Sequence, residues 1–378
     1  MIMREIKMVD LLGQYAKIKP EVDAAMQEVM DTAAFINGPQ VALFAKELAA
    51  MIQVKHVIPC ANGTDALQIA LMALDLPKGA EIIVPTFNYV ATAEVIALLG
   101  FTPVFIDADV ENYNLLVGQI ESLITENTKA IMPVHVFGQC ADMLSILKIA
   151  QKYNLYVIED AAQAIGSHCF FPDGTTRYAG TIGHIGTTSF FPSKNLGCMG
   201  DGGAIFTNDD SFALRLKTIA NHGQKAKYEY DEIGVNSRLD TLQAALLRVK
   251  LKKLYHYNQA RKEAADFYTN FFAPYPFIQT PRTSPWTAHV FHQYTIQVEA
   301  DQRDGLKKHL ESKHIPSMIY YPLPLHLHPA YQFVEKKEGS FPNAELISKK
   351  VLSLPMHTEL DNEQLLYICN SIVEYFNH

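Results

Sequence analysis

The sequence lacks the marks of several protein classes. Its 378 residues carry 32 basic and 40 acidic side chains, a formal net charge of −8, so the basic excess that nucleic-acid backbones attract is missing. No apolar run approaches the roughly 18 residues of a membrane-spanning helix, and charges interrupt residues 1–10 too often for a signal peptide. We therefore expect a cytoplasmic protein with no nucleic acid and no membrane among its partners.

Cysteine is also scarce. The five cysteines are widely separated, with no Cys-x-x-Cys and no cysteine–histidine pair at the spacing of metal ligands. They predict reduced, mostly buried thiols and no metal site. Apolar residues, in contrast, make up 48% of the chain. Since the chain is also more than twice as long as a typical domain, we expect two packed lobes.

Short apolar runs alternate with segments of helical period between residues 54 and 207. The runs predict strands at 57–59, 81–84, 103–106, 130–134 and 155–158, and the segments between them predict helices at 64–74, 92–99 and 143–152. Strands and helices that alternate in this way form βαβ units around a largely parallel sheet that is buried on both faces.

The pattern changes after two more predicted strands, at 186–191 and 203–207. Residues 238–272 contain neither proline nor glycine and predict one long helix or a kinked pair that bridges the lobes. A strand at 294–298 and helices at 302–311 and 363–375 follow. We therefore predict an α/β fold, with a large domain over residues 10–250 and a smaller α+β domain over residues 251–378.

Two polar residues follow the predicted strand at 155–158. Because ligands bind beyond the carboxyl ends of the strands in open α/β sheets, Asp160 and Gln163 would face a crevice there. The alternative for Asp160 is that it caps the next helix.

A lysine and a glycine turn complete the pattern. Lys194 lies between two predicted strands and is followed by several glycines, which suit backbone that approaches a ligand closely. Gly63 and Thr64 lie where a strand meets a helix start, a natural phosphate site, although ordinary capping by Asn62 or Thr64 is the alternative. Together, a phosphate cradle, a carboxylate and a lysine describe a site for pyridoxal phosphate.

Four ordered motifs carry a resemblance to a known family: residues 159–163 (EDAAQ), 189–194 (SFFPSK), 200–203 (GDGG) and 234–240 (GVNSRLD). With them the chain resembles the DegT/DnrJ/StrS-type nucleotide-sugar aminotransferases almost from end to end. The resemblance implies the type I fold of pyridoxal-phosphate enzymes, with a mostly parallel sheet of seven strands. It also implies a homodimer with shared active sites.

The resemblance assigns roles around the cofactor. Lys194 would form the Schiff base and then move the proton between the substrate and the cofactor, and Asp160 would pair with the pyridine nitrogen. Gln163 would lie near the 3-hydroxyl, and Tyr89 would stack on the ring unless it is a core aromatic. The phosphate would be held by Gly63, Thr64, Ser189 and, from the other subunit, Asn236.

The resemblance is strongest to the subgroup that aminates C3 of nucleotide-linked keto-sugars, and within it to enzymes acting on a UDP-linked 2-acetamido-3-oxo-glucuronate. L-Glutamate would donate the amino group, and the product would serve surface polysaccharides or related glycans. Arg238 would grip a substrate anion, unless it forms an ion pair that fixes the inter-lobe helix. Tyr320 and Tyr321 would also contact the substrate. His326 would either contact it or be a structural histidine.

Other functions stay open at this point. One is amination at C3 or C4 of a neutral deoxy keto-sugar linked to dTDP, UDP or GDP. A sugar dehydratase on the same fold would have histidine in place of Lys194. A non-catalytic sensor that binds the cofactor would not need the full set of Lys194, Asp160 and Gln163. A nicotinamide enzyme would need a Gly-x-Gly-x-x-Gly that residues 61–66 lack.

Overall fold

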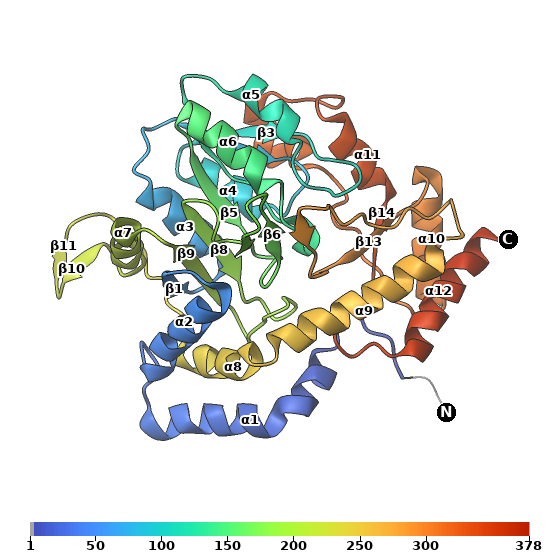
Figure 1. The fold of residues 1–378 in the computed structure, drawn as a ribbon, viewed down its shortest axis with the longest axis horizontal. Coiled ribbons are helices and arrows are strands. Elements are labelled where there is room, and N and C mark those ends of the chain that lie inside the picture. The colour runs from blue at the N-terminus through green and yellow to red at the C-terminus, as the bar shows by residue number, and fades with distance from the viewer. Residues whose placement is uncertain (1–3, 378) are drawn as a thin grey trace.

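A seven-stranded sheet forms the centre of the large lobe in the computed structural model, which describes residues 4–377 (Figure 1). In spatial order its strands are β1 (His56–Cys60), β9 (Gly203–Thr207), β8 (Ile185–Ser189), β5 (Tyr156–Asp160), β4 (Thr128–Ile131), β2 (Glu81–Pro85) and β3 (Thr102–Ile106). Only the pairs β1–β9 and β9–β8 are antiparallel. The predicted α/β fold with a mostly parallel sheet is confirmed.

Helices cover both faces of this sheet (Figure 1). On one face Ile82 and Val84 join a core with α3 (Gly63–Ala73), α4 (Ala91–Leu98) and α7 (Asp210–Ala220). On the other face Ile83 joins a core with α5 (Ile120–Leu123) and α6 (Met143–Tyr153). Because alternate residues of a strand point to opposite faces, β2 is apolar from Ile82 to Pro85 and buried on both sides over these residues.

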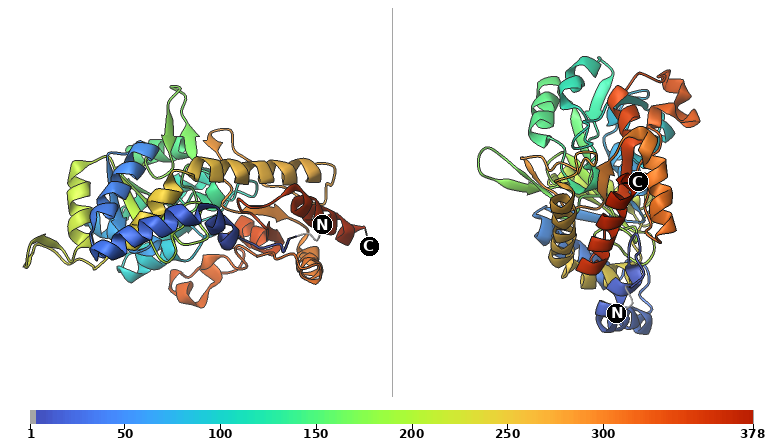
Figure 2. Two further views of the ribbon diagram at one scale, coloured as in Figure 1. Left: turned by 90° about the horizontal axis from the view of Figure 1, so that it is seen from below. Right: turned by 90° about the vertical axis from the view of Figure 1, so that its right-hand side faces the viewer.

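Three further helices pack beside β1 and β9. They are α1 (Leu11–Thr32), α2 (Pro39–Ile52) and α8 (Thr241–Leu251), which share a third core. After α8 a short break leads into α9 (Leu254–Phe272), which extends from the large lobe along the small one (Figure 2). Residues 238–272 therefore contain the kinked pair of helices, not the single long one.

The small lobe has its own core. It is built from α9, β13 (Tyr294–Gln297), β14 (Val351–Leu354), α10 (Ala300–Ser312) and α12 (Asn362–Phe376), together with Ile6. Another part of the C-terminal region, including α11 (Pro342–Lys350), packs on the core of the large lobe instead. The division at residues 250/251 stays a prediction, since the chain crosses between the two cores more than once.

Minor elements complete the fold. They are a three-stranded sheet of β12 (Thr287–Ala288), β6 (His168–Phe170) and β7 (Thr176–Tyr178), a hairpin of β10 (Gln224–Ala226) and β11 (Glu229–Tyr230), and the short helices η1 (Val117–Gln119), η2 (Val136–Gly138), η3 (Leu325–Leu327) and η4 (Pro329–Val334). The β10–β11 hairpin projects away from the body of the molecule (Figure 1).

Two expectations from composition can be compared with the structure. All five cysteines are buried and free. Within residues 4–377 no helix combines the length and the apolar character that crossing a membrane requires. Residues 1–3, where the segment considered above for a signal peptide begins, lie outside the described part of the chain.

Candidate active site

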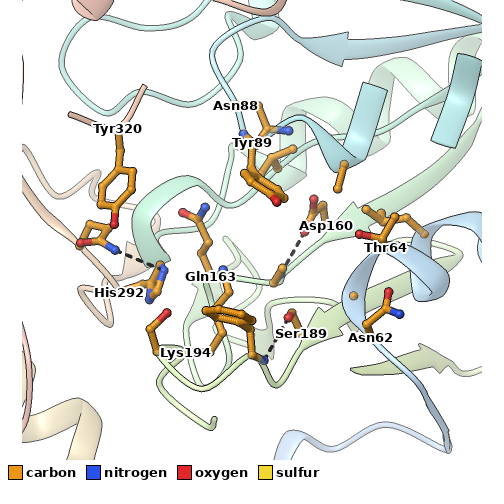
Figure 3. A pocket seen from close by; sticks show the side chains of 18 of the residues that line it. Asn62, Thr64, Asn88, Tyr89, Asp160, Gln163, Ser189, Lys194, His292 and Tyr320 are labelled. Atoms are coloured by element: carbon orange, nitrogen blue, oxygen red, sulfur yellow. Dashed lines mark hydrogen bonds between the residues drawn. The ribbon is translucent and has the colours of Figure 1, made fainter. Parts of the chain in front are cut away.

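A cavity of about 490 Å³ lies at the carboxyl ends of β5 and β8, where α3 begins (Figure 3). The structure brings nine of the predicted site residues to its wall: Gly63, Thr64, Tyr89, Asp160, Gln163, Ser189, Lys194, Tyr320 and Tyr321. These residues come from segments that are far apart in the sequence. The crevice expected at this edge of the sheet is therefore present.

The start of α3 forms an anion cradle. Asn62 caps the helix by accepting the N–H of Asp65 through Oδ1 at 2.8 Å, which leaves the N–H groups of Gly63 and Thr64 without an acceptor in the described chain. Ser189 closes the cradle from β8, and a Cβ on Gly63 would come within 2.7 Å of the Ser189 Cβ. Free N–H groups at a helix start suit a phosphate.

Asp160 is a buried carboxylate held from two sides. Its Oδ2 accepts the hydroxyl of Thr92 on α4 at 2.9 Å, and its Oδ1 accepts the N–H of Ala162 at 3.0 Å. Thr92 in turn accepts the side-chain amide of Asn88 at 2.5 Å. The contact with Ala162 resembles a local cap, but no helix begins there. The alternative that Asp160 is only a helix cap is therefore wrong.

Gln163 is fixed by two hydrogen bonds. Its Oε1 accepts the N–H of Phe137 at 2.6 Å, and its Nε2 donates to the hydroxyl of Tyr321 at 2.9 Å. The amide plane is thereby set against the cavity, and Tyr321 is tied to the same wall. Gln163 consequently presents a fixed flat surface to a ligand.

Lys194 follows a turn in which its own N–H donates to the carbonyl of Phe191 at 2.8 Å. Burial lowers the pKa of Lys194 to about 8, against the opposing influence of the Asp160 carboxylate. An amine with this pKa is partly uncharged near neutral pH, which both nucleophilic attack and proton abstraction require.

These residues fit pyridoxal phosphate. The cradle of Gly63, Thr64 and Ser189 would suit the phosphate, the Asp160 carboxylate would suit a protonated pyridine nitrogen, and Lys194 would supply the amine for the aldehyde. The absence of a Cβ at Gly63 lets α3 begin this close to Ser189.

Aromatic side chains border the mouth of the cavity. Tyr89 is 58% exposed and Phe191 is 52% exposed, and Tyr89 lies above the cavity in Figure 3. The alternative that Tyr89 is a core aromatic is therefore wrong. Its stacking on a bound ring stays a prediction.

Three predicted residues do not line this cavity: Asn236, Arg238 and His326. Asn236 is exposed and Arg238 is half-buried. No described residue forms an ion pair with Arg238, so it does not fix the inter-lobe helix in that way.

His326 has a structural setting. Its Nδ1 lies 2.8 Å from the hydroxyl of Thr86, and its Nε2 lies 3.1 Å from the carboxylate of Glu345. The ring is buried. Both nitrogens are used within the chain, so the structure corrects the expected substrate contact in favour of the structural alternative.

His292 and Gln293 line the cavity although the sequence patterns did not indicate them. Figure 3 shows His292 at the cavity wall. They lie in the segment that leads into β13, far along the chain from the motifs. Their position depends on a long-range contact, because the N–H of His292 donates to the carbonyl of Phe137 at 2.8 Å. The only local signal is a pair of histidines, His289 and His292, before an apolar strand.

The chain is similar to known proteins over nearly its whole length. The model of the DegT/DnrJ/EryC1/StrS aminotransferase family matches residues 16–373. The chain is 44% identical to a "pleiotropic regulatory protein" of Geobacillus stearothermophilus, covering 99% of both chains. It is 43% identical to a UDP-N-acetyl-3-dehydro-α-D-glucosamine 3-aminotransferase of Acidithiobacillus ferrooxidans, covering 97% of both. It is also 43% identical to a UDP-2-acetamido-2-deoxy-3-oxo-D-glucuronate aminotransferase of Pseudomonas aeruginosa, covering 97% of this chain and 99% of that one.

Solved structures give the same picture. DesV of S. venezuelae superposes with a TM-score of 0.95 at 37% identity over the whole of both chains. NtdA of Bacillus subtilis, solved with bound cofactor PMP, has a TM-score of 0.88 at 30% identity and covers 96% of this chain and 82% of that one.

Proposed function

The chain belongs to the DegT/DnrJ/EryC1/StrS aminotransferase family, and from this premise we propose that it transfers an amino group from L-glutamate to C3 of UDP-2-acetamido-2-deoxy-3-oxo-glucuronate. Its cofactor is pyridoxal phosphate, and nucleotide-sugar transamination is its class of reaction. The observation that carries the proposal is the meeting of Lys194, Asp160 and the phosphate cradle in one cavity, in a chain with relatives that aminate C3.

The side chains divide the work of the reaction. Pyridoxal phosphate, when bound, supplies an aldehyde that reacts with amines and a ring that accepts electrons. Lys194 would hold the aldehyde, and its free amine would take up and return a proton at the substrate carbon. Asp160 holds a positive charge at the ring nitrogen, and Thr92 orients the Asp160 carboxylate at 2.9 Å. Gln163 and Tyr321 form the wall on which the ring is oriented.

Lys194 suits proton transfer because its charge is easily lost. Burial lowers its pKa to about 8, so the amine accepts a proton from carbon and releases it again near neutral pH. Without a basic group at this place neither half-reaction proceeds. The intact lysine also separates this chain from the dehydratases, which have histidine there.

The choice of a uronate depends on Arg238. Its guanidinium has no ion-pair partner in the described chain, and a guanidinium binds a carboxylate through paired hydrogen bonds. The alternative substrate is a neutral 3-keto sugar, such as the one in the name of the Acidithiobacillus relative. In that case Arg238 would bind the diphosphate.

A homodimer would bring Arg238 and Asn236 to the cavity. Ser237, between them, accepts the N–H of Ala61 at 3.0 Å, so this segment lies beside the strand end that precedes α3. Nearby, the β10–β11 hairpin and the turn after it expose Tyr228, Tyr230 and Ile233, the last by 86%. Exposed apolar groups on a projecting arm favour contact with a second copy.

The test of the substrate is a panel of nucleotide amino sugars added to the cofactor-loaded enzyme in the reverse direction. The proposed product, UDP-2-acetamido-3-amino-glucuronate, should convert the cofactor from the aldehyde to the amine form fastest, as seen by absorbance. Lys194→Ala is the control that should show no conversion. Faster conversion by a neutral 3-amino sugar would favour the alternative, and no conversion by any member would refute both.

A further inference from the structure

We propose that His292 binds the α-carboxylate of the amino donor beside Lys194, and that the same ring, uncharged, serves the keto-sugar in the other half-reaction. The inference rests on the proposed function, because it requires an amino acid as the donor. It assigns a substrate-binding role to a cavity residue outside the sequence motifs.

The backbone that carries His292 is clamped in place. Its N–H donates to the carbonyl of Phe137 at 2.8 Å. On the other side the buried guanidinium of Arg261, from α9, donates to the carbonyls of Phe291 and His292 at 3.3 Å each and to that of Met356 at 3.0 Å. The ring is thereby held at the cavity wall near Lys194 (Figure 3).

The ring of His292 has hydrogen-bonding capacity that the chain does not use. Its Nδ1 is buried and has no partner among the described residues. Its Nε2 has only a contact of 3.5 Å with the side-chain amide of Gln293. Buried polar atoms are nearly always paired in folded proteins. An unpaired ring nitrogen on a residue of the active-site wall therefore indicates a partner that arrives with a ligand.

The charges around the ring keep it neutral before a ligand binds. Burial, the Lys194 ammonium and the Arg261 guanidinium hold the pKa of His292 well below its ordinary value. The other ionisable groups on the cavity wall are Asp160, Asp201, Tyr89, Tyr320 and Tyr321. Asp160 is occupied by Thr92 and Ala162. A carboxylate that binds beside the ring would raise the pKa of His292, because an adjacent anion favours the protonated imidazole.

The position of the donor carboxylate follows from its chemistry. The donor amine must replace Lys194 at the same point, and its α-carboxylate is attached to the carbon that bears this amine. It therefore lies within a few ångströms of the Lys194 side chain. Among the cavity-lining residues in the described chain, Lys194 is the only lysine or arginine, and His292 is the only other basic side chain.

The keto-sugar would bring uncharged groups to the position beside His292. The groups beside its C3 keto carbon are an acetamido group and a hydroxyl, which are both neutral. A neutral imidazole can form hydrogen bonds with such groups. An arginine is always charged, so its charge would be buried beside them without a partner of opposite sign. A histidine can meet both substrates because its charge changes between half-reactions.

The test separates the half-reactions in the cofactor-loaded enzyme. In His292→Asn an amide replaces the ring and can still hydrogen-bond, but it cannot become a cation. The donor half-reaction with L-glutamate should slow at least tenfold in kcat/KM, the loss expected for a charged hydrogen bond. The sugar half-reaction should change less than threefold or so.

The matched control is His289→Asn. His289 is also buried, stacks on Phe291 with ring centroids 3.9 Å apart, and is outside the cavity lining. If His289→Asn reproduced the selective loss, or if His292→Asn slowed both half-reactions equally, the effect would be structural and the inference would be wrong.

A second readout does not depend on turnover. Glutarate, which has carboxylates but no amine, is titrated into the loaded enzyme calorimetrically in two buffers of different ionisation enthalpy at about pH 6.5, near the ordinary pKa of histidine. Wild type should take up more protons than His292→Asn, by up to about one. Equal uptake would overturn the inference. A wild-type enzyme that converts the keto-sugar but no amino acid would instead refute the proposed donor, and one that converts neither would refute the proposed function.

Discussion

The inner and outer ends of the cavity are built in different ways. At the inner end Asp160 and Gln163 are buried and each makes two hydrogen bonds within the chain. At the outer end Tyr89 and Phe191 are more than half exposed. Arg238, which does not line the cavity, has no ion-pair partner in the described residues. The inner residues are therefore fixed within one chain, whereas the aromatic residues at the outer end are left open to solvent.

This difference predicts which substitutions affect every substrate and which distinguish one substrate from another. The inner residues are held by the sheet edge, so a change there should affect every substrate alike. The outer residues depend on a ligand or a second copy for their contacts, so a change there should distinguish one substrate from another. The variants below are chosen to separate these two kinds of effect.

The largest effect is expected at Lys194. Lys194→Ala removes both the amine that binds the aldehyde and the group that moves the proton, so turnover should fall by roughly four orders of magnitude or more with any sugar. Borohydride reduction of the wild type should attach the cofactor at residue 194, as peptide mapping would show. A label on another lysine would remove Lys194 from this role.

Asp160→Asn should follow, with a loss of roughly a hundredfold to a thousandfold in both half-reactions. The amide keeps the shape of the carboxylate but no longer holds the proton on the ring nitrogen. The rates are measured with saturating cofactor, so that weaker binding does not contribute. Near-normal turnover would show that the charge of Asp160 is dispensable.

At the outer end the effect should depend on the sugar. Arg238→Lys keeps the charge but loses the paired hydrogen bonds, and should lower kcat/KM for a uronate about tenfold or more. The same substitution should lower kcat/KM for the matching neutral sugar only slightly. The subgroup that the chain resembles often has histidine where Tyr320 stands, so Tyr320→His should favour the uronate. Equal losses for both sugars would assign Arg238 to the diphosphate or to the geometry of the lobes.

The smallest effect is a pH dependence of cofactor capture by the apoprotein. Burial lowers the pKa of Lys194 to about 8, so the reactive free amine predominates above that pH. Below it, the rate of covalent capture should fall about tenfold per pH unit. Stopped-flow absorbance between pH 6.5 and about 10 measures this. A rate that continues to rise up to pH 10 would indicate a lysine of ordinary basicity.

Much of the fold could be predicted because its signals are local. Alternating apolar runs indicated the seven sheet strands, and the stretch without glycine or proline indicated α8 and α9. The helices α1 and α2 were not predicted. They pack with α8 in the third core. Their signal was also local, because Phe44, Leu48 and Ile52, which are buried in α2, recur four residues apart.

The site residues also fall into two groups, those with a local signal in the sequence and those whose place depends on distant contacts. Asp160, Gln163 and Lys194 lie in motifs beside strands, so their meeting at one sheet edge could be foreseen. His292 could not, because its place depends on contacts with Phe137 and Arg261, far away in the sequence. The role of His326 could not be decided because its partners Thr86 and Glu345 are equally distant. Sequence alone does not reveal whether a histidine nitrogen is already used.

The most direct test of whether a second copy completes the cavity is an experiment that mixes two inactive proteins. Lys194→Ala removes the amine that would bind the cofactor aldehyde, and Asn236→Ala removes the residue that a second copy would contribute to the cofactor phosphate. After subunit exchange, verified by mass spectrometry of the intact dimers, statistical mixing should place one intact site in each heterodimer and restore about a quarter of the wild-type sites. Heterodimers that form but remain as inactive as the parents would contradict the account, because Asn236 would then not complete the cavity of another subunit.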